Sequence, residues 1–331
     1  MKICVYGAGA VGGVIAARLA LSGASVSVVA RGEHLNAIRE TGLRLETSDS
    51  IDVVRVTASD EPGALGRQDV VIAAVKAHQL PDIVGGLTTL LNEGTAVIYA
   101  VNGMPWWYFH NATGPSNERR LPALDPGGRL WDQVGVGRTI GCIINFPAAV
   151  ISPGSVRQGG GNNRIALGEL GGEQSLRLAD IAAALRSAGF VVDTHRPIRE
   201  EVWTKLAHVM VASTIAVLTS APPGIAFSDA AIRDLARKIY GEAFDIAAAH
   251  GYPGSGNIDA LIAGQQRSTN KPSMLQDLEA GRPMEIDPQL TVPIALAHDA
   301  RVRVPILDVL LGLIRARASH AGLYKGAEFS G

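Results

Sequence analysis

The sequence predicts an α/β protein in which an N-terminal domain built on a parallel β-sheet is followed by an all-α C-terminal domain. Three observations lead to this prediction. The chain has 331 residues, which is more than one hydrophobic core usually organises. Short β-rich runs alternate with helical patterns over the first 196 residues, as expected of a parallel sheet with helical crossovers. Beyond Arg199 the β-rich runs disappear. We therefore predict domains at 1–196 and 197–331.

The composition favours a folded protein that acts on small molecules. Hydrophobic residues make up 47% of the chain and charged residues 18%, with a formal net charge of −1. Because no large basic cluster is present, the chain lacks the electrostatic footprint of a nucleic-acid-binding protein. The apolar run 209–221 is too short and too rich in Ser and Thr to span a bilayer. We expect neither a nucleic-acid partner nor a membrane.

The two cysteines, Cys4 and Cys142, lie in apolar, strand-like stretches and match no metal-binding or redox motif. We predict that they are buried thiols, that the chain binds no metal, and that it is cytoplasmic, since disulfides are rare in that compartment. The opening MKICVYGAGA brings its glycines too early for a signal peptide.

The first strand, at 2–6, leads into a glycine-rich turn and then into a helical pattern. A second strand at 25–30 completes the unit. In this arrangement Gly7 permits the turn, Gly9 lets a pyrophosphate approach the backbone, and Gly12 lets helix and strand pack closely. This pattern predicts a Rossmann domain rather than a merely glycine-rich βα turn. The predicted cofactor loop consists of Gly7, Ala8, Gly9, Ala10, Val11 and Gly12.

The residue that follows the second strand indicates which dinucleotide is bound. An NAD enzyme usually has Asp or Glu there to hold the ribose hydroxyls. This chain has Arg31, whose cation suits a 2′-phosphate and can stack on adenine. We therefore expect NADP(H); the alternative is that Arg31 is an ordinary surface residue.

Two further strands, at 69–75 and 95–101, lead into Lys76 and Asn102. In an open α/β sheet the carboxyl ends of the strands line the ligand crevice. Both residues are therefore predicted to lie beside the cofactor. The alternatives are a solvated loop lysine and an Asn-Gly turn.

The segment 104–138 breaks the alternation with MPWWYFH and a stretch rich in Pro, Asn, Gly and Arg. Long irregular segments are usually functional or mobile, and so many aromatic residues do not fit a disordered linker. Two interpretations stay open: a lid over the substrate, or a patch buried against another subunit of a homodimer. Strands at 139–145 and 164–167, a helix at 173–188 and a strand at 190–194 complete the domain.

The second domain is predicted to contain helices at 201–219, 228–250, 258–267, 273–280, 288–300 and 305–319. A cleft between the two domains is the expected place for the chemistry. The stretch EVWTKLAH, at 201–208, puts Lys205 on the shoulder of an apolar helix face. Taken alone, this window favours a solvated helix edge, with Glu201 and Lys205 in a surface ion pair.

Several motifs together resemble the ketopantoate reductase (2-dehydropantoate 2-reductase) family, within the 6-phosphogluconate-dehydrogenase-like group. They are GAGAVG at 7–12, VKAHQ around Lys76, VNGM around Asn102, WTKLA around Lys205, and SMLQD at 273–277 followed by Glu285. Their order and spacing agree from residue 1 to about residue 300. WTKLA followed by SMLQD is far more specific than the glycine motif.

The resemblance implies an NADP-dependent oxidoreductase that reduces a 2-oxo acid, ketopantoate to pantoate in the pantothenate and coenzyme A pathway. It implies that Lys205 donates a proton to the substrate carbonyl and that Asn102 contacts the nicotinamide end and the substrate. It also implies that Ser273 binds the substrate carboxylate and that Glu285 lies near the cofactor and the lysine. Ser273 with Gln276 also matches a helix capping box, and Glu285 has the alternative of a surface carboxylate.

The chain departs from the family where asparagines usually bind the substrate. The corresponding positions hold Val209, Ser213 and Pro223. Losing these amides weakens the selection for a hydroxyl-bearing substrate, so a larger or more apolar oxo acid is the alternative. A member of the larger group acting on a 3-hydroxy acid or an amino-acid-derived substrate, and a non-catalytic NADPH sensor, also stay open. Whether His208 or Thr214 replaces the amides is likewise open.

Overall fold

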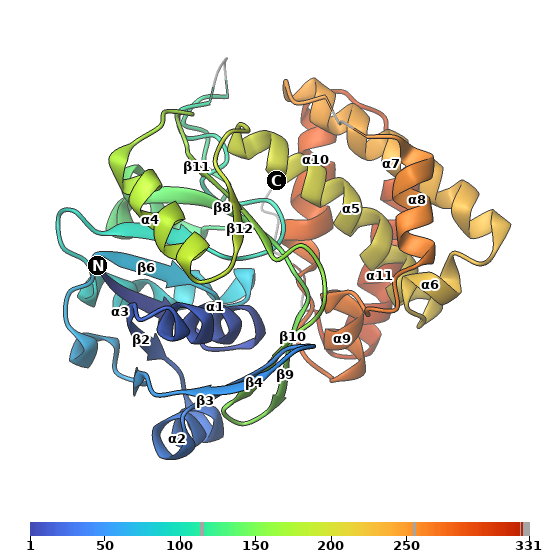
Figure 1. The fold of residues 1–331 in the computed structure, drawn as a ribbon. Helices are drawn as coiled ribbons and strands as arrows, with labels where there is room; N and C mark the ends of the chain where they lie inside the picture. Colours follow the sequence, from blue (N-terminus) through green and yellow to red (C-terminus); the bar gives the residue numbers. More distant parts are fainter. Residues whose placement is uncertain (113–115, 254–255, 325, 327–331) are drawn as a thin grey trace. The chain divides into compact units, whose positions relative to one another are not determined.

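The computed structural model describes residues 1–112, 116–253, 256–324 and 326. The chain divides into two compact units (Figure 1). The first contains Met1–Asn102 and Trp106–Ile198, and the second contains Gly103–Pro105 and Arg199–Gly331. A parallel-sheet unit thus precedes a helical one, and the predicted fold class is confirmed.

The first unit is built on an eight-stranded sheet in the order β12-β11-β8-β7-β6-β1-β2-β5. All neighbours are parallel except β8 and β11, which are antiparallel. β1 lies between β2 and β6, so the strand order reverses beside it, and such a switch point is where α/β sheets bind ligands. The strands are β1 (Lys2–Tyr6), β2 (Ser25–Val29), β5 (Thr57–Ser59), β6 (Val70–Ala73), β7 (Ala96–Tyr99), β8 (Thr139–Asn145), β11 (Arg164–Glu169) and β12 (Val191–Asp193).

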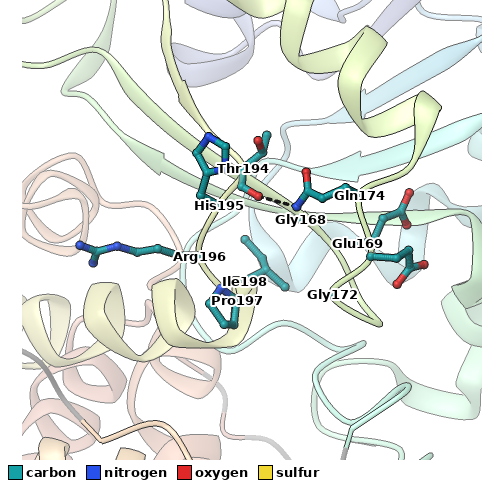
Figure 2. A pocket seen from close by; sticks show the side chains of 10 residues that line it. Gly168, Glu169, Gly172, Gln174, Thr194, His195, Arg196, Pro197 and Ile198 are labelled. Atoms are coloured by element: carbon teal, nitrogen blue, oxygen red, sulfur yellow. Dashed lines mark hydrogen bonds between the residues drawn. The ribbon is translucent and has the colours of Figure 1, made fainter.

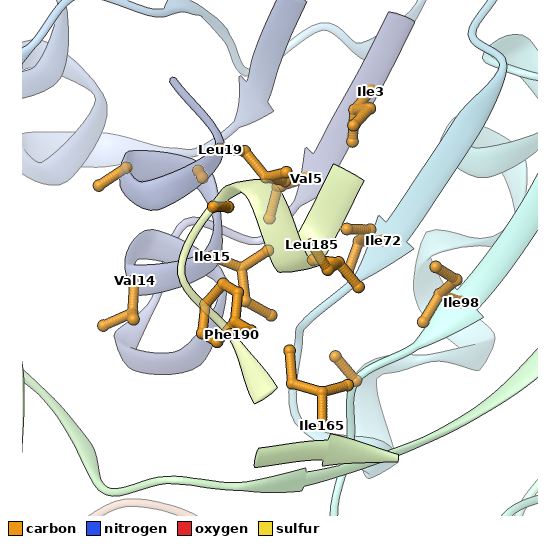
Figure 3. Close-up of a cluster of buried hydrophobic side chains, with 14 of the residues drawn as sticks. Ile3, Val5, Val14, Ile15, Leu19, Ile72, Ile98, Ile165, Leu185 and Phe190 are labelled. Carbon is orange, nitrogen blue, oxygen red and sulfur yellow. The ribbon is translucent and has the colours of Figure 1, made fainter. Parts of the chain in front are cut away.

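Four helices accompany these strands: α1 (Ala10–Leu21), α2 (Gly32–Thr41), α3 (Val84–Thr89) and α4 (Leu176–Ser187). Figure 3 shows the core, in which α1 and α4 side chains such as Ile15 and Leu185 pack with Val5 and Ile72 of the sheet. Burying one such side chain contributes about 1.5–3 kcal/mol. This core fixes where α1 starts, and therefore where the glycine loop lies.

Both cysteines are buried in this sheet, as expected. Burial raises the pKa of the Cys4 thiol to about 11 and that of the Cys142 thiol to about 12. Both thiols therefore stay protonated at neutral pH, and they behave as small core residues.

A second, four-stranded sheet in the order β4-β3-β10-β9 was not expected. It consists of β3 (Leu43–Glu46), β4 (Ile51–Val54), β9 (Ala148–Ser152) and β10 (Ser155–Gln158). It packs against α1, where a Cβ added to Gly13 would lie 2.6 Å from Val156 Cγ1. Only glycine fits at that contact.

The aromatic side chains of the 104–138 segment are part of the core. The Trp106 ring meets Tyr99 edge-on at 5.3 Å and Trp131 at 6.0 Å. Trp107 fills the space above Gly141, where a Cβ would lie 2.9 Å from its ring. Short turns and a π-helix, Leu130–Gly135, follow. Both expected interpretations, a lid and a subunit patch, are therefore wrong for the buried aromatic residues Trp106, Trp107, Tyr108 and Phe109.

The second unit is helical, as predicted. Its elements are α5 (Ile198–Thr219), α6 (Pro223–Ala226), α7 (Ala230–Ala249), α8 (Ile258–Gln266), α9 (Ser273–Glu279), a π-helical stretch (Asp287–Thr291), α10 (Val292–Asp299) and α11 (Pro305–His320). Asp229 accepts hydrogen bonds at the start of α7 and Asn257 at the start of α8. Glu242 on α7 accepts the amides of Ile306 and Leu307 at 2.9 and 2.8 Å, which joins α7 to the start of α11.

Within the described ranges, α5 alone is long and apolar enough to cross a membrane. Most of its residues are buried in the protein, however, including Leu206, Met210 and Ile215. A long apolar helix that is mostly buried is typical of a core helix.

Candidate functional site

The glycine loop between β1 and α1 has the geometry that a dinucleotide needs. Gly7 has a φ of +98°, which favours glycine. A Cβ on Gly12 would lie 2.0 Å from the carbonyl oxygen of Gly7, so no side chain fits there. Around Gly9, in contrast, no heavy atom lies within 4 Å of the Cβ position. The loop is thus closed on its core side and open at Gly9.

The amide groups of this loop form a cradle for an anion. Gly7 and Ala8 both donate to the carbonyl oxygen of Val29, at 3.0 and 3.2 Å. In the part of the chain that the structure describes, the N–H of Gly9 donates to no protein acceptor. The first-turn amides of α1, from Ala10 to Gly12, also lack acceptors within the helix. These donors and the helix dipole fit a pyrophosphate group.

Arg31 lies between β2 and α2, the strand and the helix that follow the glycine loop and α1. It is exposed at the N-cap position of α2, and no acidic residue occupies the end of β2. Its charge lowers the pKa of the Tyr6 hydroxyl, although burial outweighs this effect and leaves that pKa raised. Within the described residues this guanidinium makes no ion pair, and an exposed guanidinium at this position fits a 2′-phosphate and therefore NADP(H).

Lys76 and Asn102 follow β6 and β7, and both are half-buried. The register pairs Tyr6 with Ala73 and Ala73 with Tyr99, so the carboxyl ends of β1, β6 and β7 are level. The backbone N–H of Lys76 donates to Gln79 Oε1 at 3.2 Å. Within the first unit, therefore, the two predicted residues extend from the sheet edge that holds the glycine loop.

In the second unit, Lys205 belongs to a short accessible strip on the otherwise buried α5. Thr204, Lys205 and Val209 are half-buried and His208 is exposed, whereas their neighbours along the helix are buried. The preceding Trp203 is buried and stacks on His250 at 5.6 Å. This packing fixes the rotation of α5 and keeps the lysine face of the helix accessible.

The electrostatic setting of Lys205 suits a proton donor. Desolvation lowers its pKa to about 8. Over the described residues its ammonium makes no hydrogen bond and no ion pair. The expected surface ion pair with Glu201 is wrong, because Glu201 is buried. A lysine with this pKa is still mostly protonated at neutral pH and gives up its proton more readily than an ordinary lysine.

His208, one turn beyond Lys205, is held by two buried polar residues. Tyr240 Oη lies 3.1 Å from Nδ1, and Gln265 Nε2 lies 2.7 Å from Nε2. Desolvation, together with the charge of Lys205, lowers the pKa of His208 to about 4. Although accessible, the imidazole is therefore neutral at physiological pH, with both ring nitrogens engaged. Tyr240 and Gln265 lie on other helices and left no signal in the sequence.

The residues expected in place of the family's asparagines differ in exposure. Ser213 is 3% exposed and Thr214 is fully buried, with its hydroxyl donating to the carbonyl of Met210. Pro223 begins α6 and is buried. Thr214 therefore presents no polar group to a ligand in this structure, whereas the substrate-binding role of Ser213 stays a prediction. Val209 and His208 remain on the accessible strip.

Two further expectations about the second unit are corrected. The capping box of Ser273 and Gln276 is wrong, because Pro272 takes the N-cap position of α9 and Ser273 makes no capping bond. Gln276 instead donates to the carbonyl of Lys271 at 2.8 Å. Glu285 is 4% exposed, so the surface-carboxylate alternative is also wrong. Ser273 is half-buried and is the first residue of α9, not its N-cap.

A separate small cavity in the first unit does not compete with these sites. It has a volume of about 100 Å³ and lies around Gln174 and Thr194, where Gln174 donates to the Thr194 carbonyl at 2.9 Å (Figure 2). Sites for small molecules and cofactors usually measure about 300–1,000 Å³. This cavity is too small for a dinucleotide.

The fold and the two sets of residues define a class of protein. The first unit is a Rossmann unit with an anion cradle and an exposed Arg31. The helical unit contributes a half-buried lysine whose pKa is lowered. Together these features are typical of an NADP-dependent oxidoreductase.

Comparison with known proteins then identifies the family. The model "Ketopantoate reductase PanE/ApbA" matches residues 3–106, and "Ketopantoate reductase PanE/ApbA C terminal" matches residues 197–318. A 2-dehydropantoate 2-reductase of Mesorhizobium japonicum is 39% identical over 98% of this chain and 100% of its own length. The chain belongs to the ketopantoate reductase family and is an NADP-dependent oxidoreductase that acts on CH–OH groups, as the sequence motifs implied.

Solved structures agree with this assignment. A protein of Ralstonia solanacearum MolK2 that is classed as a ketopantoate reductase is 39% identical, with a TM-score of 0.91, covering 98% of this chain and 99% of its own. A PanE/ApbA family ketopantoate reductase of Ralstonia eutropha JMP134 is 25% identical, with a TM-score of 0.81, covering 97% of this chain and 100% of its own.

Proposed function

We propose that this protein uses NADPH to reduce a 2-oxo acid to a 2-hydroxy acid, with ketopantoate as the first candidate substrate and pantoate as the product. The observation that supports this most is Lys205, a half-buried ammonium with a pKa of about 8 and no ion-pair partner over the described residues. The similarity to the 2-dehydropantoate 2-reductase of Mesorhizobium japonicum supports the choice of ketopantoate.

In the proposed reaction Lys205 carries out one step, the protonation of the substrate's carbonyl oxygen. When bound, NADPH supplies the hydride that reduces the carbonyl carbon. Negative charge then develops on the carbonyl oxygen, and the Lys205 ammonium stabilises this charge and donates a proton to the oxygen. The lysine is left neutral and regains a proton from water. Its lowered pKa makes it a stronger acid than an ordinary lysine, so proton transfer to the developing alkoxide is more favourable, while a pKa of about 8 still lets it regain a proton at neutral pH.

The other predicted residues receive supporting roles in this proposal. Residues 1–196 bind the cofactor, through the glycine loop, Arg31 and Lys76, and residues 197–331 bind the substrate. Asn102 offers an amide to the nicotinamide end and to the substrate. The hydroxyl of Ser273, the half-buried first residue of α9, binds the substrate carboxylate. Glu285 orients the cofactor and the lysine from its buried position.

A pair of lysine variants tests the central role of Lys205. Lys205→Ala should lower turnover by about 10²- to 10⁴-fold, the usual contribution of a positioned acid, while NADPH binding, followed by its fluorescence, stays within about twofold. Lys238→Ala, on the exposed face of α7, is the matched control and should change neither. A wild-type protein that binds NADPH tightly but reduces no oxo acid would instead be the non-catalytic sensor.

The accessible strip on α5 favours a second candidate substrate class. Val209 has no hydrogen-bonding group, and both nitrogens of His208 are already engaged by Tyr240 and Gln265. A substrate hydroxyl placed there would give up its bonds to water without replacement, which costs about 1–3 kcal/mol. An oxo acid with an apolar side chain avoids this cost. Comparing ketopantoate with 3-methyl-2-oxobutanoate, which lacks the hydroxymethyl group, separates the two candidates.

The proposal also includes the cellular compartment and the oligomeric state of the protein. We assign it to the cytoplasm, where its two buried thiols stay reduced, and expect a homodimer. Analytical ultracentrifugation of the full chain at micromolar concentration should give twice the mass of one chain; a single-chain mass would contradict the homodimer.

A further inference from the structure

His34 bridges two backbone segments of the first unit that are far apart in the sequence. It lies in the first turn of α2, three residues after Arg31. Its Nε2 lies 2.7 Å from the carbonyl oxygen of Ala8, inside the glycine loop. Its Nδ1 accepts a hydrogen bond from the backbone N–H of Gly154, at 3.0 Å. The ring therefore joins the cofactor loop to the turn between β9 and β10.

The two partners fix the protonation state of the ring. A backbone N–H can only donate, so Nδ1 of His34 must be an unprotonated acceptor. A carbonyl oxygen can only accept, so Nε2 must hold the proton and donate it to Ala8. One neutral tautomer satisfies both bonds. The doubly protonated ring would lose the bond from Gly154.

The bond to Ala8 also determines where the next amide points. In a trans peptide the carbonyl and the following N–H point in opposite directions. Holding the Ala8 carbonyl on the His34 side therefore turns the Gly9 N–H to the opposite side. That N–H has no protein acceptor in the described part of the chain, and the space around the Gly9 Cβ position is open. The imidazole thus holds the anion-binding amide of the loop in place.

The other end of the bridge is itself rigid. Gly154 has a φ of +72°, and a Cβ there would lie 2.8 Å from Ala37 Cβ. Its carbonyl accepts the amide of Arg44, the neighbour of Leu43 at the start of β3, at 2.9 Å. The turn is therefore fixed to both α2 and the small sheet. This gives the small sheet, which the sequence did not predict, a function: it supports His34.

We propose that His34 is a positioning residue for cofactor binding, which uses the small sheet as an anchor and holds the Ala8–Gly9 peptide in the orientation that binds the pyrophosphate. The pyrophosphate is common to NADPH and NADH. His34 therefore sets the affinity for both dinucleotides, whereas Arg31 sets the preference between them.

Three variants of the full chain test this role by fluorescence titration with NADPH and with NADH. His34→Leu removes both bonds and should raise both dissociation constants about 5- to 20-fold, as expected for one lost orienting hydrogen bond. His34→Gln offers a donor and an acceptor spaced like the ring nitrogens and should restore most of the affinity. His320→Leu, an exposed histidine in the last turn of α11, is the control and should change neither constant.

Two further readouts distinguish positioning from general destabilisation. His34→Leu should leave kcat at saturating NADPH within about twofold, while Arg31→Ala should weaken NADPH alone. If His34→Leu weakens NADPH but not NADH, or if Gln restores nothing, the proposal is overturned. If the His34→Leu variant does not fold, ¹⁵N spectra of the wild-type protein test the bridge through the tautomer of the His34 imidazole. We expect the Nε2–H tautomer at neutral pH. The Nδ1–H tautomer would contradict the bridge.

Discussion

Lys205 lies one turn before His208 on α5, and its charge adds to the desolvation that lowers the pKa of His208 to about 4. The lysine itself has a pKa of about 8. At neutral pH this pair therefore combines a protonated amine with a neutral imidazole, as the proposed role of Lys205 as proton donor requires.

The pH dependence of reduction follows from the lysine. Because the protonated form donates, kcat/KM for reduction should be level up to about pH 7 and fall about tenfold per unit above the pKa of about 8. Oxidation of the hydroxy acid needs the neutral lysine and should rise over the same range. The measurement is kcat/KM against pH in both directions. If kcat/KM for reduction stayed constant up to pH 10, Lys205 would not be the proton donor.

The same lysine should cost folding stability. Its pKa is about 8 in the folded chain against an ordinary lysine value of 10.5, so between these values the unfolded chain holds a proton that the folded chain has lost. Stability should therefore rise with pH across that window. Below about pH 8 both states are protonated and the full cost applies. Lys205→Met should then raise the free energy of unfolding at pH 7, by about 3 kcal/mol at most.

Urea unfolding at pH 7 and at pH 10 measures this effect. The gain from Lys205→Met should shrink at the higher pH, while Lys238→Met, on the exposed face of α7, should show no such dependence. A destabilised Lys205→Met variant at pH 7 would contradict the desolvated position of the lysine.

A substitution at Val209 should change substrate selection. Val209→Asn restores an amide to the accessible strip of α5, where the family usually has one. The ratio of kcat/KM for ketopantoate over 3-methyl-2-oxobutanoate should rise about 10-fold, as expected for one hydrogen bond to the hydroxyl. Val309→Asn, an exposed residue of α11, is the control. An unchanged ratio would mean that the substrate side chain does not lie against Val209.

Two glycine variants should separate cofactor binding from folding. Gly9→Ala adds a methyl group where no heavy atom lies within 4 Å, so stability should be kept while the methyl obstructs the pyrophosphate and NADPH affinity falls about 10-fold or more. Gly12→Ala forces a contact of 2.0 Å with the Gly7 carbonyl and should cost several kcal/mol of stability. Thermal unfolding and NADPH titration give the two readouts. Equal losses of stability would contradict the open geometry at Gly9.

Local signals in the sequence predicted most of the fold. The apolar runs that became β6 and β7, and the helical spacing from α5 to α11, depend on residues near one another in the chain. The small sheet escaped prediction because its strands are short and because β3 pairs with β10, which lies far away in the sequence. The aromatic residues 106–109 were misinterpreted for a similar reason, since their partners Tyr99, Trp131 and Gly141 are spread over other elements.

The residues of the candidate site also divide into those that local sequence patterns indicate and those that depend on contacts between distant elements. Gly12 and Lys205 could be proposed from motifs, because those motifs are short local patterns, and the structure shows no room for a side chain at Gly12 and a lowered pKa at Lys205. The partners of His208 could not, because Tyr240 and Gln265 come from α7 and α8. The capping assignment of Ser273 failed because Pro272, which precedes it, already provides the extended residue that starts α9.

The reductase activity is tested most directly by following NADPH oxidation by the purified wild-type protein, first with ketopantoate and then with 3-methyl-2-oxobutanoate. We expect rapid oxidation with at least one of the two acids and much slower oxidation when NADH replaces NADPH. Tight NADPH binding without oxidation by either acid would contradict the assignment of this chain as a 2-oxo acid reductase.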